Sequence, residues 1–383
     1  MGNSKRHIAF ILGAGFSVPA GYPTANKLNE DIKLIINNKK YQSFQDRHNG
    51  ILESYIFDKV LIDYNQINNF NYEEYFDVLN NEIGNKLDQN RLRSYIESGM
   101  YKYFWKGKKE FESQICNNQI SSIFNAVIKE CNNYKALVEG RCEEYQNIIA
   151  HALLNGNIDG KCHSFNKCYL NFVKILTEYR RNGYQIDIFT LNHDLFLESI
   201  LSLKELKDDV CTGFGSDVKI IRNKKYVVFN VNFYNKPIKV YKLHGSIDIH
   251  ELSFYNRQEK KFIKILDGYS DSNAFLMDTD KGVNIIPMFL TGRKTKKLQY
   301  YNEPYKSLFK EFKKHLDMAD KLVVIGYGGN DNVINNVVKD YYNWKEKQLI
   351  VVAPKVFDHK FVKEYKGVSK DISVTDLTYN DLI

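Results

Sequence analysis

Four short stretches of the chain combine glycines with polar side chains that could carry out acid–base or anion-binding chemistry. In chain order they are residues 13–17 (GAGFS), 190–194 (TLNHD), 243–246 (LHGS) and 326–331 (GYGGND). The imidazole of His244 and the carboxyl group of Asp194 can exchange protons, and the amide of Asn192 can fix a nucleophile. Glycine-rich turns admit an anion such as pyrophosphate to the backbone N–H groups. This combination favours a nucleotide site.

The first stretch follows the continuous apolar run of residues 8–12, which predicts a parallel strand buried on both faces. Gly13, Ala14 and Gly15 would bring backbone N–H groups to a phosphate, and Ser17 adds a hydroxyl. Pro23 closes this loop before a helical segment. A dehydrogenase fingerprint would need a third glycine at position 18, where the chain has a valine, so hydride transfer is disfavoured. A tight strand-to-helix turn without a ligand remains the alternative.

The elements around these stretches predict an α/β fold. Residues 185–190, 321–326 and 349–353 are further buried strands, and residues 372–375 are a candidate last strand. Ser164 and Gly183 mark the start and end of a helix, and helices follow the second and fourth stretches. Residues 218–243 alternate apolar and polar side chains across two turns, which predicts a small β-meander. We expect a Rossmann-like parallel sheet with helices on both faces and ligand-binding groups at its carboxyl edge.

The domain organisation follows from the long segment between the first two strands. Residues 37–160 read as a helical insertion, with a helical stripe of core side chains at Tyr72, Tyr75, Phe76 and Leu79. Residues 1–36 and 161–383 would then form one catalytic domain.

The composition of the 383-residue chain excludes several classes of protein. A net charge of +8, from 54 Lys+Arg and 46 Asp+Glu, permits nucleic-acid binding without requiring it. No apolar run reaches the length of a membrane span, and we expect a cytoplasmic protein. The six cysteines include no CxxC pair, which favours reduced thiols. Cys162, His163 and Cys168 lack a second ligand pair at suitable spacing, so no metal is expected.

The four stretches together resemble the sirtuin-like superfamily, particularly its bacterial NAD-consuming branch in antiphage defence systems. By this resemblance Asn192 would orient the nicotinamide ribose and the attacking water, Asp194 would hold the nicotinamide carboxamide, and His244 would be the general base. The remaining residues would bind the rest of NAD, with the pyrophosphate at the first stretch and the adenosine half at the fourth. They are Gly13, Ala14, Gly15, Ser17, Pro23, Thr190, Gly245, Gly326, Tyr327, Asn330 and Asp331.

The chain also departs from protein-deacylating sirtuins. It lacks their paired CxxC motifs, and Thr24 and Ala25 follow Pro23 where those enzymes carry Phe-Arg. His193, beside the family asparagine, is expected to pack at the start of the following helix. An NAD-dependent deacylase is therefore a weaker alternative.

The resemblance implies an NAD glycohydrolase that releases nicotinamide and linear or cyclic ADP-ribose as a defence effector. NAD would be its substrate. The resemblance further implies a homo-oligomer controlled by a separately encoded partner, for which a HerA-type ATPase is the best candidate. A different class remains open, in which Lys294, Lys296 and Lys297 make the chain a nucleic-acid-binding or processing subunit.

Overall fold

The computed structural model describes eleven stretches of the chain: 6–37, 71–77, 145–146, 148–150, 152–153, 167–221, 224–254, 257–266, 283–292, 299–354 and 359–383. The chain divides into two compact units. The first comprises residues 1–28, 149–290 and 297–383, and the second comprises residues 29–148 and 291–296. Most of the predicted insertion, 37–160, lies outside the described residues, so its extent and helical character stay a prediction there.

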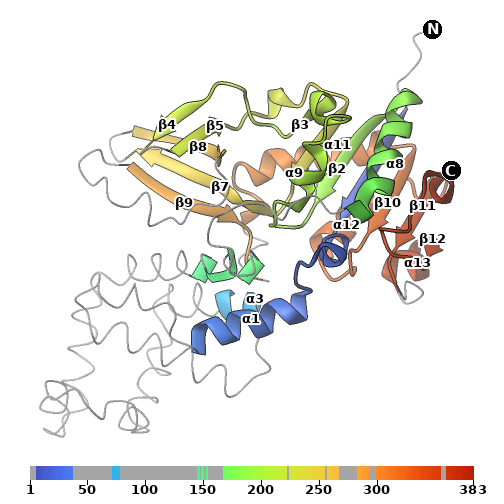
Figure 1. Cartoon of the computed structure of the whole chain (residues 1–383), viewed down its shortest axis with the longest axis horizontal. Coiled ribbons are helices and arrows are strands. Elements are labelled where there is room, and N and C mark those ends of the chain that lie inside the picture. The colour runs from blue at the N-terminus through green and yellow to red at the C-terminus, as the bar shows by residue number, and fades with distance from the viewer. Residues whose placement is uncertain are drawn as a thin grey trace, which may run out of the picture. The chain divides into compact units, whose positions relative to one another are not determined.

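The first unit is built on a seven-stranded sheet in which every paired strand is parallel (Figure 1). Its spatial order is β12-β11-β10-β1-β2-β6-β3. The strands are β1 (His7–Leu12), β2 (Gln185–Thr190), β3 (Val210–Cys211), β6 (Ile238–Lys242), β10 (Lys321–Ile325), β11 (Gln348–Val352) and β12 (Val368–Lys370). The predicted Rossmann-like parallel sheet is confirmed.

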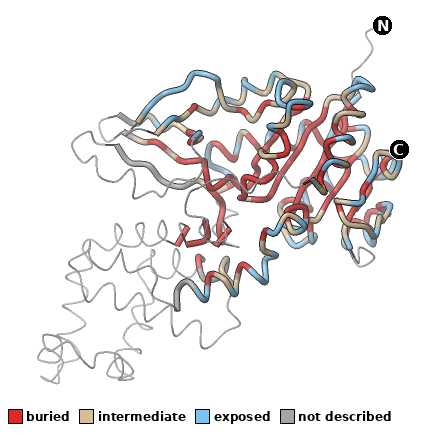
Figure 2. Tube along the Cα trace, in the orientation of Figure 1, coloured by how far each residue is buried: buried red, intermediate tan, exposed pale blue. Residues whose placement is uncertain are grey.

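Helices cover both faces of this sheet, so alternate residues of β1 enter two different cores. Ile8, Phe10 and Leu12 pack on one side with α8 (Leu170–Arg181) and α9 (Phe196–Leu201). Ala9 and Ile11 pack on the other side with α11 (Tyr305–Met318), α12 (Asn332–Tyr341) and α13 (Lys360–Tyr365). The whole of β1 is buried (Figure 2), as its unbroken apolar run predicts.

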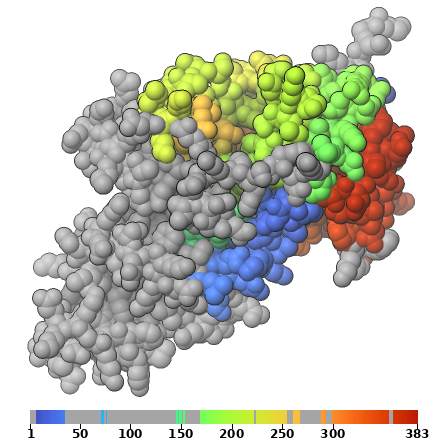
Figure 3. Space-filling model, viewed as in Figure 1, coloured from blue at the N-terminus to red at the C-terminus, as the bar shows by residue number. Residues whose placement is uncertain are grey.

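Short helical turns complete the unit: η1 (Ala14–Phe16), η2 (Val18–Ala20), η7 (Lys167–Tyr169), η8 (Lys207–Asp209), η9 (Val231–Phe233) and η13 (Tyr379–Leu382). The end of the chain lies beside α8, where green and red surfaces meet in Figure 3. There Tyr179 donates a hydrogen bond to the carbonyl oxygen of Leu382 at 3.2 Å. Gly183 takes a φ of 78° directly after α8, which confirms the predicted helix end. Ser164, the predicted helix start, lies outside the described residues.

A second, antiparallel sheet has the order β4-β5-β8-β7-β9. Its strands are β4 (Lys219–Ile221), β5 (Lys224–Val228), β7 (Gly245–Phe254), β8 (Arg257–Ile265) and β9 (Val283–Phe289). The predicted meander over 218–243 is therefore correct for β4 and β5 and wrong for β6, which pairs in parallel with β2. The reason is burial on both faces: Val240 enters one core of the parallel sheet and Tyr241 enters the other.

The predicted last strand at 372–375 is also wrong. The edge strand is β12, and the segment after it forms a turn in which Ser373 accepts a hydrogen bond from the N–H of Asp376 at 3.1 Å. Val374 is buried in the core all the same. An apolar side chain in a turn can thus be buried in the core. A short apolar run therefore does not distinguish a buried strand from a turn that packs on the core.

The second unit contains α3 (Tyr72–Asp77), which begins after Asn71. The side chain of Asn71 accepts a hydrogen bond from the N–H of Glu73 at 3.1 Å, as is usual at a helix start. Phe76 is buried and stacks on Tyr145 with ring centroids 6.2 Å apart. The predicted stripe is confirmed at Phe76, whereas Leu79 lies outside the described residues. The helix α1 (Ala25–Asn37) runs from the first unit into the second.

Within the parts of the chain that the structure describes, no helix has the length and apolar character needed to cross a bilayer.

The close contact between the loops after β1 and β10 predicts that one methyl group added at Gly13 lowers the stability of the fold. A Cβ at Gly13 would lie 2.5 Å from the Cα of Tyr327, whereas a Cβ at Gly328 would meet nothing closer than 3.5 Å. We expect Gly13→Ala to lower the free energy of unfolding by about 1–3 kcal/mol through overpacking, measured by urea unfolding. Gly328→Ala is the matched control, and equal midpoints for the two variants would contradict this account.

Candidate functional site

The four polar stretches of the sequence follow four neighbouring strands. In the sheet, β10, β1, β2 and β6 are adjacent and parallel, so their carboxyl ends form one row. With strands about 4.8 Å apart, the row is about 15 Å long. After β1 the chain forms β2 on one side of β1 in the sheet, and it later forms β10 on the other side of β1. Such a switch point is where open α/β sheets bind ligands.

The glycines of the first and fourth stretches are explained by contact between their own loops. The N–H of Gly13 donates to the carbonyl oxygen of Ile325 at 3.0 Å, and the N–H of Gly15 donates to that of Gly326 at 2.9 Å. Gly326 has a φ of 63°, and a Cβ there would lie 2.2 Å from the N of Phe16. The N–H groups of Gly13 and Gly15 are therefore paired with protein carbonyl oxygens in this structure, and the binding of a pyrophosphate by this stretch stays a prediction.

A cavity of about 500 Å³ lies beside this contact. Its wall includes residues of the loops after β1, β10 and β11, among them Gly15, Thr24, Tyr327, Pro354 and His359. This volume lies within the usual range for small-molecule sites. The cavity is therefore a place among the described residues where a nucleotide could be held next to the glycine loops.

Three of the predicted residues form one buried cluster. The Nδ2 of Asn192 donates to the carbonyl oxygen of Gly13 at 3.0 Å and to the Oγ of Ser17 at 3.1 Å. The carboxyl group of Asp194 accepts the N–H of Phe196 at 3.0 Å. Burial raises the pKa of Asp194, although the nearby Lys242 ammonium and the nearby Ser17 hydroxyl favour the charged form of this carboxyl group and oppose the rise. The structure thus joins the first two polar stretches.

Lys242 holds this cluster against β6, and the sequence analysis gave it no role. It is buried, its Nζ donates to the backbone carbonyl of Asp194, and it lies 3.1 Å from the Oε1 of Glu198. A lysine between the apolar residues Tyr241 and Leu243 was the available signal, since lysines are seldom buried without a partner.

The third and fourth stretches meet through a residue that the sequence analysis missed. The hydroxyl of Tyr300 lies 3.0 Å from the Nε2 of His244 and donates to the Oδ2 of Asp331 at 3.2 Å. His244 Nε2 itself lies 3.4 Å from that oxygen. When Tyr300 donates its proton to Asp331, its oxygen is the acceptor for an Nε2 proton of His244. In that tautomer, Nδ1 is the proton-accepting nitrogen of His244.

Asp331 also fixes the start of α12. Its Oδ1 accepts the N–H groups of Val333 at 2.9 Å and Ile334 at 3.3 Å, as a helix-capping carboxylate does. The sequence suggested no partner for this residue in the region of Tyr300, which carried no recognisable motif. The long-range contact could be seen only in the structure.

Other predicted residues have local structural roles. The Oγ1 of Thr190 accepts the N–H of Asn192 at 3.1 Å. The hydroxyl of Tyr327 bonds to the Oδ1 of Asn335 at 2.9 Å and to the backbone of Asp331. Gly245 has a φ of 76°, and a Cβ there would clash with the carbonyl oxygen of Met288 at 2.1 Å.

The remaining predicted residues make fewer contacts. Ala14 and Asn330 are exposed, and Pro23 is partly buried between η2 and α1. The ring of His193 lies 5.1 Å from that of Phe289 in β9 and 6.2 Å from that of His244, so its packing at the helix start stays a prediction. The cofactor-binding roles of these residues stay predictions.

His359 is a further wall residue that the sequence analysis missed. Its Nδ1 accepts the N–H of Phe361, so its Nε2 donates to the carbonyl oxygen of Tyr327 at 2.6 Å. Burial lowers the pKa of His359, which favours this neutral form. The side chain thus supports the loop after β10.

Several earlier predictions lie outside the described residues. These include Lys294, Lys296 and Lys297, and the Cys162 and His163 positions considered for a metal. Cys168 and Cys211 are described, and both are thiols.

Part of the chain is similar to a known protein family. Residues 187–369 match the family model described as a SIR2-like domain. This segment contains the second, third and fourth polar stretches. No curated protein matches the chain.

The structure is also similar to solved structures of sirtuins. A Sir2 homologue in complex with NAD is 10% identical, with 98% of this chain and 88% of that chain covered and a TM-score of 0.42. A Sir2 bound to an acetylated peptide is 11% identical, with 98% and 91% covered and a TM-score of 0.40. Similarity at this level does not define the ligand or activity of this chain.

The buried carboxyl group of Asp194 predicts a stability that falls as pH rises. Because burial raises its folded-state pKa above the unfolded value of about 3.9, the folded protein retains this proton where the unfolded chain has lost it. We expect wild-type stability, relative to Asp194→Asn, to decrease as pH rises above about 4. Urea unfolding over a pH series measures this difference.

Asp381→Asn provides a control of opposite sign. Hydrogen bonds from Thr378 lower the pKa of Asp381, so wild-type stability relative to this variant should increase with pH through the acid range. A difference between wild type and Asp194→Asn that is independent of pH would contradict the account of Asp194.

Proposed function

We propose that this protein binds NAD and cleaves its bond between ribose and nicotinamide, releasing nicotinamide and ADP-ribose. The observation that carries the proposal is the row of strand ends, which places Asn192 and Asp194 beside the strand that presents His244. The SIR2-like match supports it, because that match spans all three residues. The cavity beside the glycine loops provides space for the nucleotide.

The proposed chemistry assigns one role to each buried group. Cleavage passes through an oxocarbenium-like state that develops positive charge on the ribose. In the tautomer whose Nε2 proton goes to Tyr300, the Nδ1 of His244 would take a proton from a ribose hydroxyl or from water. The Nδ2 of Asn192 serves Gly13 and Ser17, so its Oδ1 would orient the hydroxyl or water.

Asp194 would hold the leaving group. Burial favours its protonated form, which can donate a hydrogen bond to the carboxamide oxygen of nicotinamide. Nicotinamide departs as a neutral ring, so the reaction needs less acid catalysis than ordinary glycoside hydrolysis.

The biological setting is part of the same proposal. By its sequence resemblance, the protein would act as a homo-oligomeric antiphage effector with a separately encoded HerA-type ATPase. An enzyme that destroys NAD requires such control. The missing CxxC pairs argue for NAD hydrolysis over deacylation.

The first test is nicotinamide release from NAD by the purified chain, alone and with the candidate ATPase. We expect wild-type activity to fall by about 10²- to 10⁴-fold in His244→Ala, as for loss of a general base, and to fall strongly in Asn192→Ala. Intact NAD under every condition would contradict the proposal. Deacetylation of a peptide that depends on NAD would instead support a deacylase.

A second test concerns the hydroxyl of Tyr300. Tyr300→Phe removes the nearer partner of the His244 Nε2 and leaves the Oδ2 of Asp331, 3.4 Å away, so we expect kcat to fall by about 10- to 100-fold with a smaller change in KM. Tyr301→Phe is the matched control, since Tyr301 is 79% exposed. If both variants retain wild-type kcat, Tyr300 does not position His244.

A further inference from the structure

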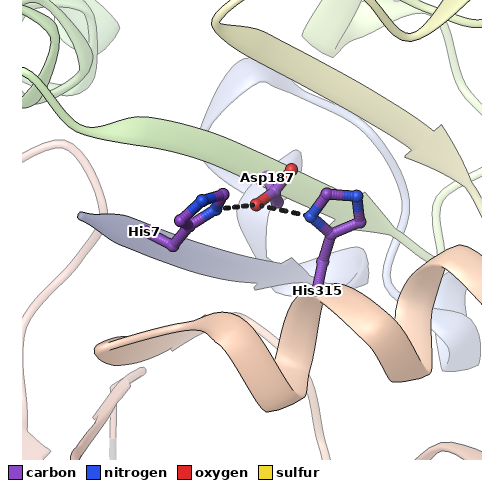
Figure 4. A group of neighbouring side chains, drawn as sticks. All are labelled: His7, Asp187 and His315. Atoms are coloured by element: carbon purple, nitrogen blue, oxygen red, sulfur yellow. Dashed lines mark hydrogen bonds and ion pairs between the residues drawn. The ribbon is translucent and has the colours of Figure 1, made fainter. Parts of the chain in front are cut away.

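Three titratable side chains meet at the opposite end of the strands from the candidate site. His7 is the first residue of β1, Asp187 is the third residue of β2, and His315 belongs to α11 (Figure 4). Their exposed fractions are 8%, 0% and 3%. Figure 4 shows both imidazoles directed at one carboxylate oxygen of Asp187.

The surroundings make a buried carboxylate costly. The neighbours of Asp187 on this face of the sheet include Ala9, Phe189 and Tyr241, which belong to the apolar core beneath α11. Burying a charge in such surroundings is unfavourable unless it is paired. The Nζ of Lys239, on the adjacent strand, lies 3.7 Å from Oδ1 of Asp187. The other oxygen, Oδ2, faces the two histidines.

His315 has an unusual arrangement of hydrogen bonds. Its Nε2 bonds to the Oε2 of Glu311 at 3.2 Å, and a carboxylate accepts, so Nε2 carries the proton. In the neutral ring, Nδ1 then presents a lone pair. This Nδ1 lies 3.1 Å from the Oδ2 of Asp187, yet none of the described residues forms a hydrogen bond with it. A lone pair facing a carboxylate oxygen requires a cation between them or a second proton on the ring.

We propose that the Nδ1 of His7, the Oδ2 of Asp187 and the Nδ1 of His315 bind a divalent transition metal of the zinc type. All three atoms lie within 4.8 Å of one another. The two nitrogen-to-oxygen separations are 3.3 and 3.1 Å. Bonds of about 2.0–2.1 Å in a tetrahedral zinc site place neighbouring ligand atoms about 3.3 Å apart, which agrees with the two nitrogen-to-oxygen separations. The two nitrogens lie within 4.8 Å of each other.

The donor set favours zinc over magnesium or calcium. Two imidazole nitrogens and one carboxylate oxygen suit Zn²⁺, whereas Mg²⁺ and Ca²⁺ select oxygen ligands. The hydrogen bond from His315 to Glu311 matches the outer carboxylate that commonly orients a metal-binding histidine. Because the ligands come from β1, β2 and α11, the ion would join three elements and have a structural role.

The direct test is metal binding by the full chain after tag removal and dialysis against a chelator. We expect about one equivalent of Zn²⁺ to bind, with only nitrogen and oxygen neighbours by X-ray absorption. The six cysteines make this readout decisive. A sulfur shell at about 2.3 Å would assign the ion to thiols, and that result or the absence of bound zinc would overturn the proposal.

Variants locate the site. We expect His315→Gln and Asp187→Asn to lose zinc binding, and Glu311→Gln to weaken it by about 10- to 100-fold. Cys168→Ser is the control that should bind as wild type does. Circular dichroism confirms folding of each variant, and zinc should raise the melting temperature of wild type but not of folded His315→Gln. Equal zinc binding by folded His315→Gln and wild type would overturn the proposal.

Nitrogen NMR of the metal-free and zinc-treated protein tests the alternative. If His315 carries protons on both ring nitrogens after zinc addition, the cluster is an imidazolium–carboxylate pair and the proposal is wrong.

Discussion

The arrangement of the first unit depends on the close contact between two loops that have glycine where their backbones meet. Gly13 and Gly15 touch the backbone of Gly326 and Tyr327 at distances that exclude a side chain. This contact sets the distance between the ends of β1 and β10. Asn192, which bonds to the carbonyl oxygen of Gly13, and Asp331, which follows Gly326 in the chain, both take their positions from it.

Two buried hydrogen-bond groups extend from this contact along the carboxyl edge. One joins Asn192 to Gly13 and Ser17 beside Asp194, and the other joins His244, Tyr300 and Asp331. Each crosses between strands that are distant in sequence, so each ties the site to the sheet. Buried polar groups that are partnered in this way hold a single geometry, which is what a catalytic arrangement requires.

The sequence predicted the elements whose patterns are local. The apolar run of β1, the helix end at Gly183 and the turn after β10 follow from burial and backbone conformation, and these agree with the structure. Prediction failed where the same alternation of apolar and polar residues occurs both in a meander strand and in a strand of the parallel sheet. β6 alternates like a meander strand but is buried on both faces of the parallel sheet.

The candidate site was predictable where its residues belong to local patterns. Asn192, Asp194 and His244 follow strands and carry distinctive chemistry, so their row could be inferred from the parallel sheet. The contact of Tyr300 with His244 joins residues 56 positions apart, and no spacing reports it. The glycines were recognised as special, but the sequence could not show that their N–H groups bond to protein carbonyls instead of a ligand.

Asp331 gives this architecture a particular evolutionary constraint. One oxygen of its carboxylate begins α12 and the other holds Tyr300 beside His244. Selection for stability and selection for the histidine's orientation therefore act on the same side chain. A lineage without the proposed reaction would still retain an acceptor at this position to cap the helix, so an aspartate or asparagine here is not by itself a sign of activity.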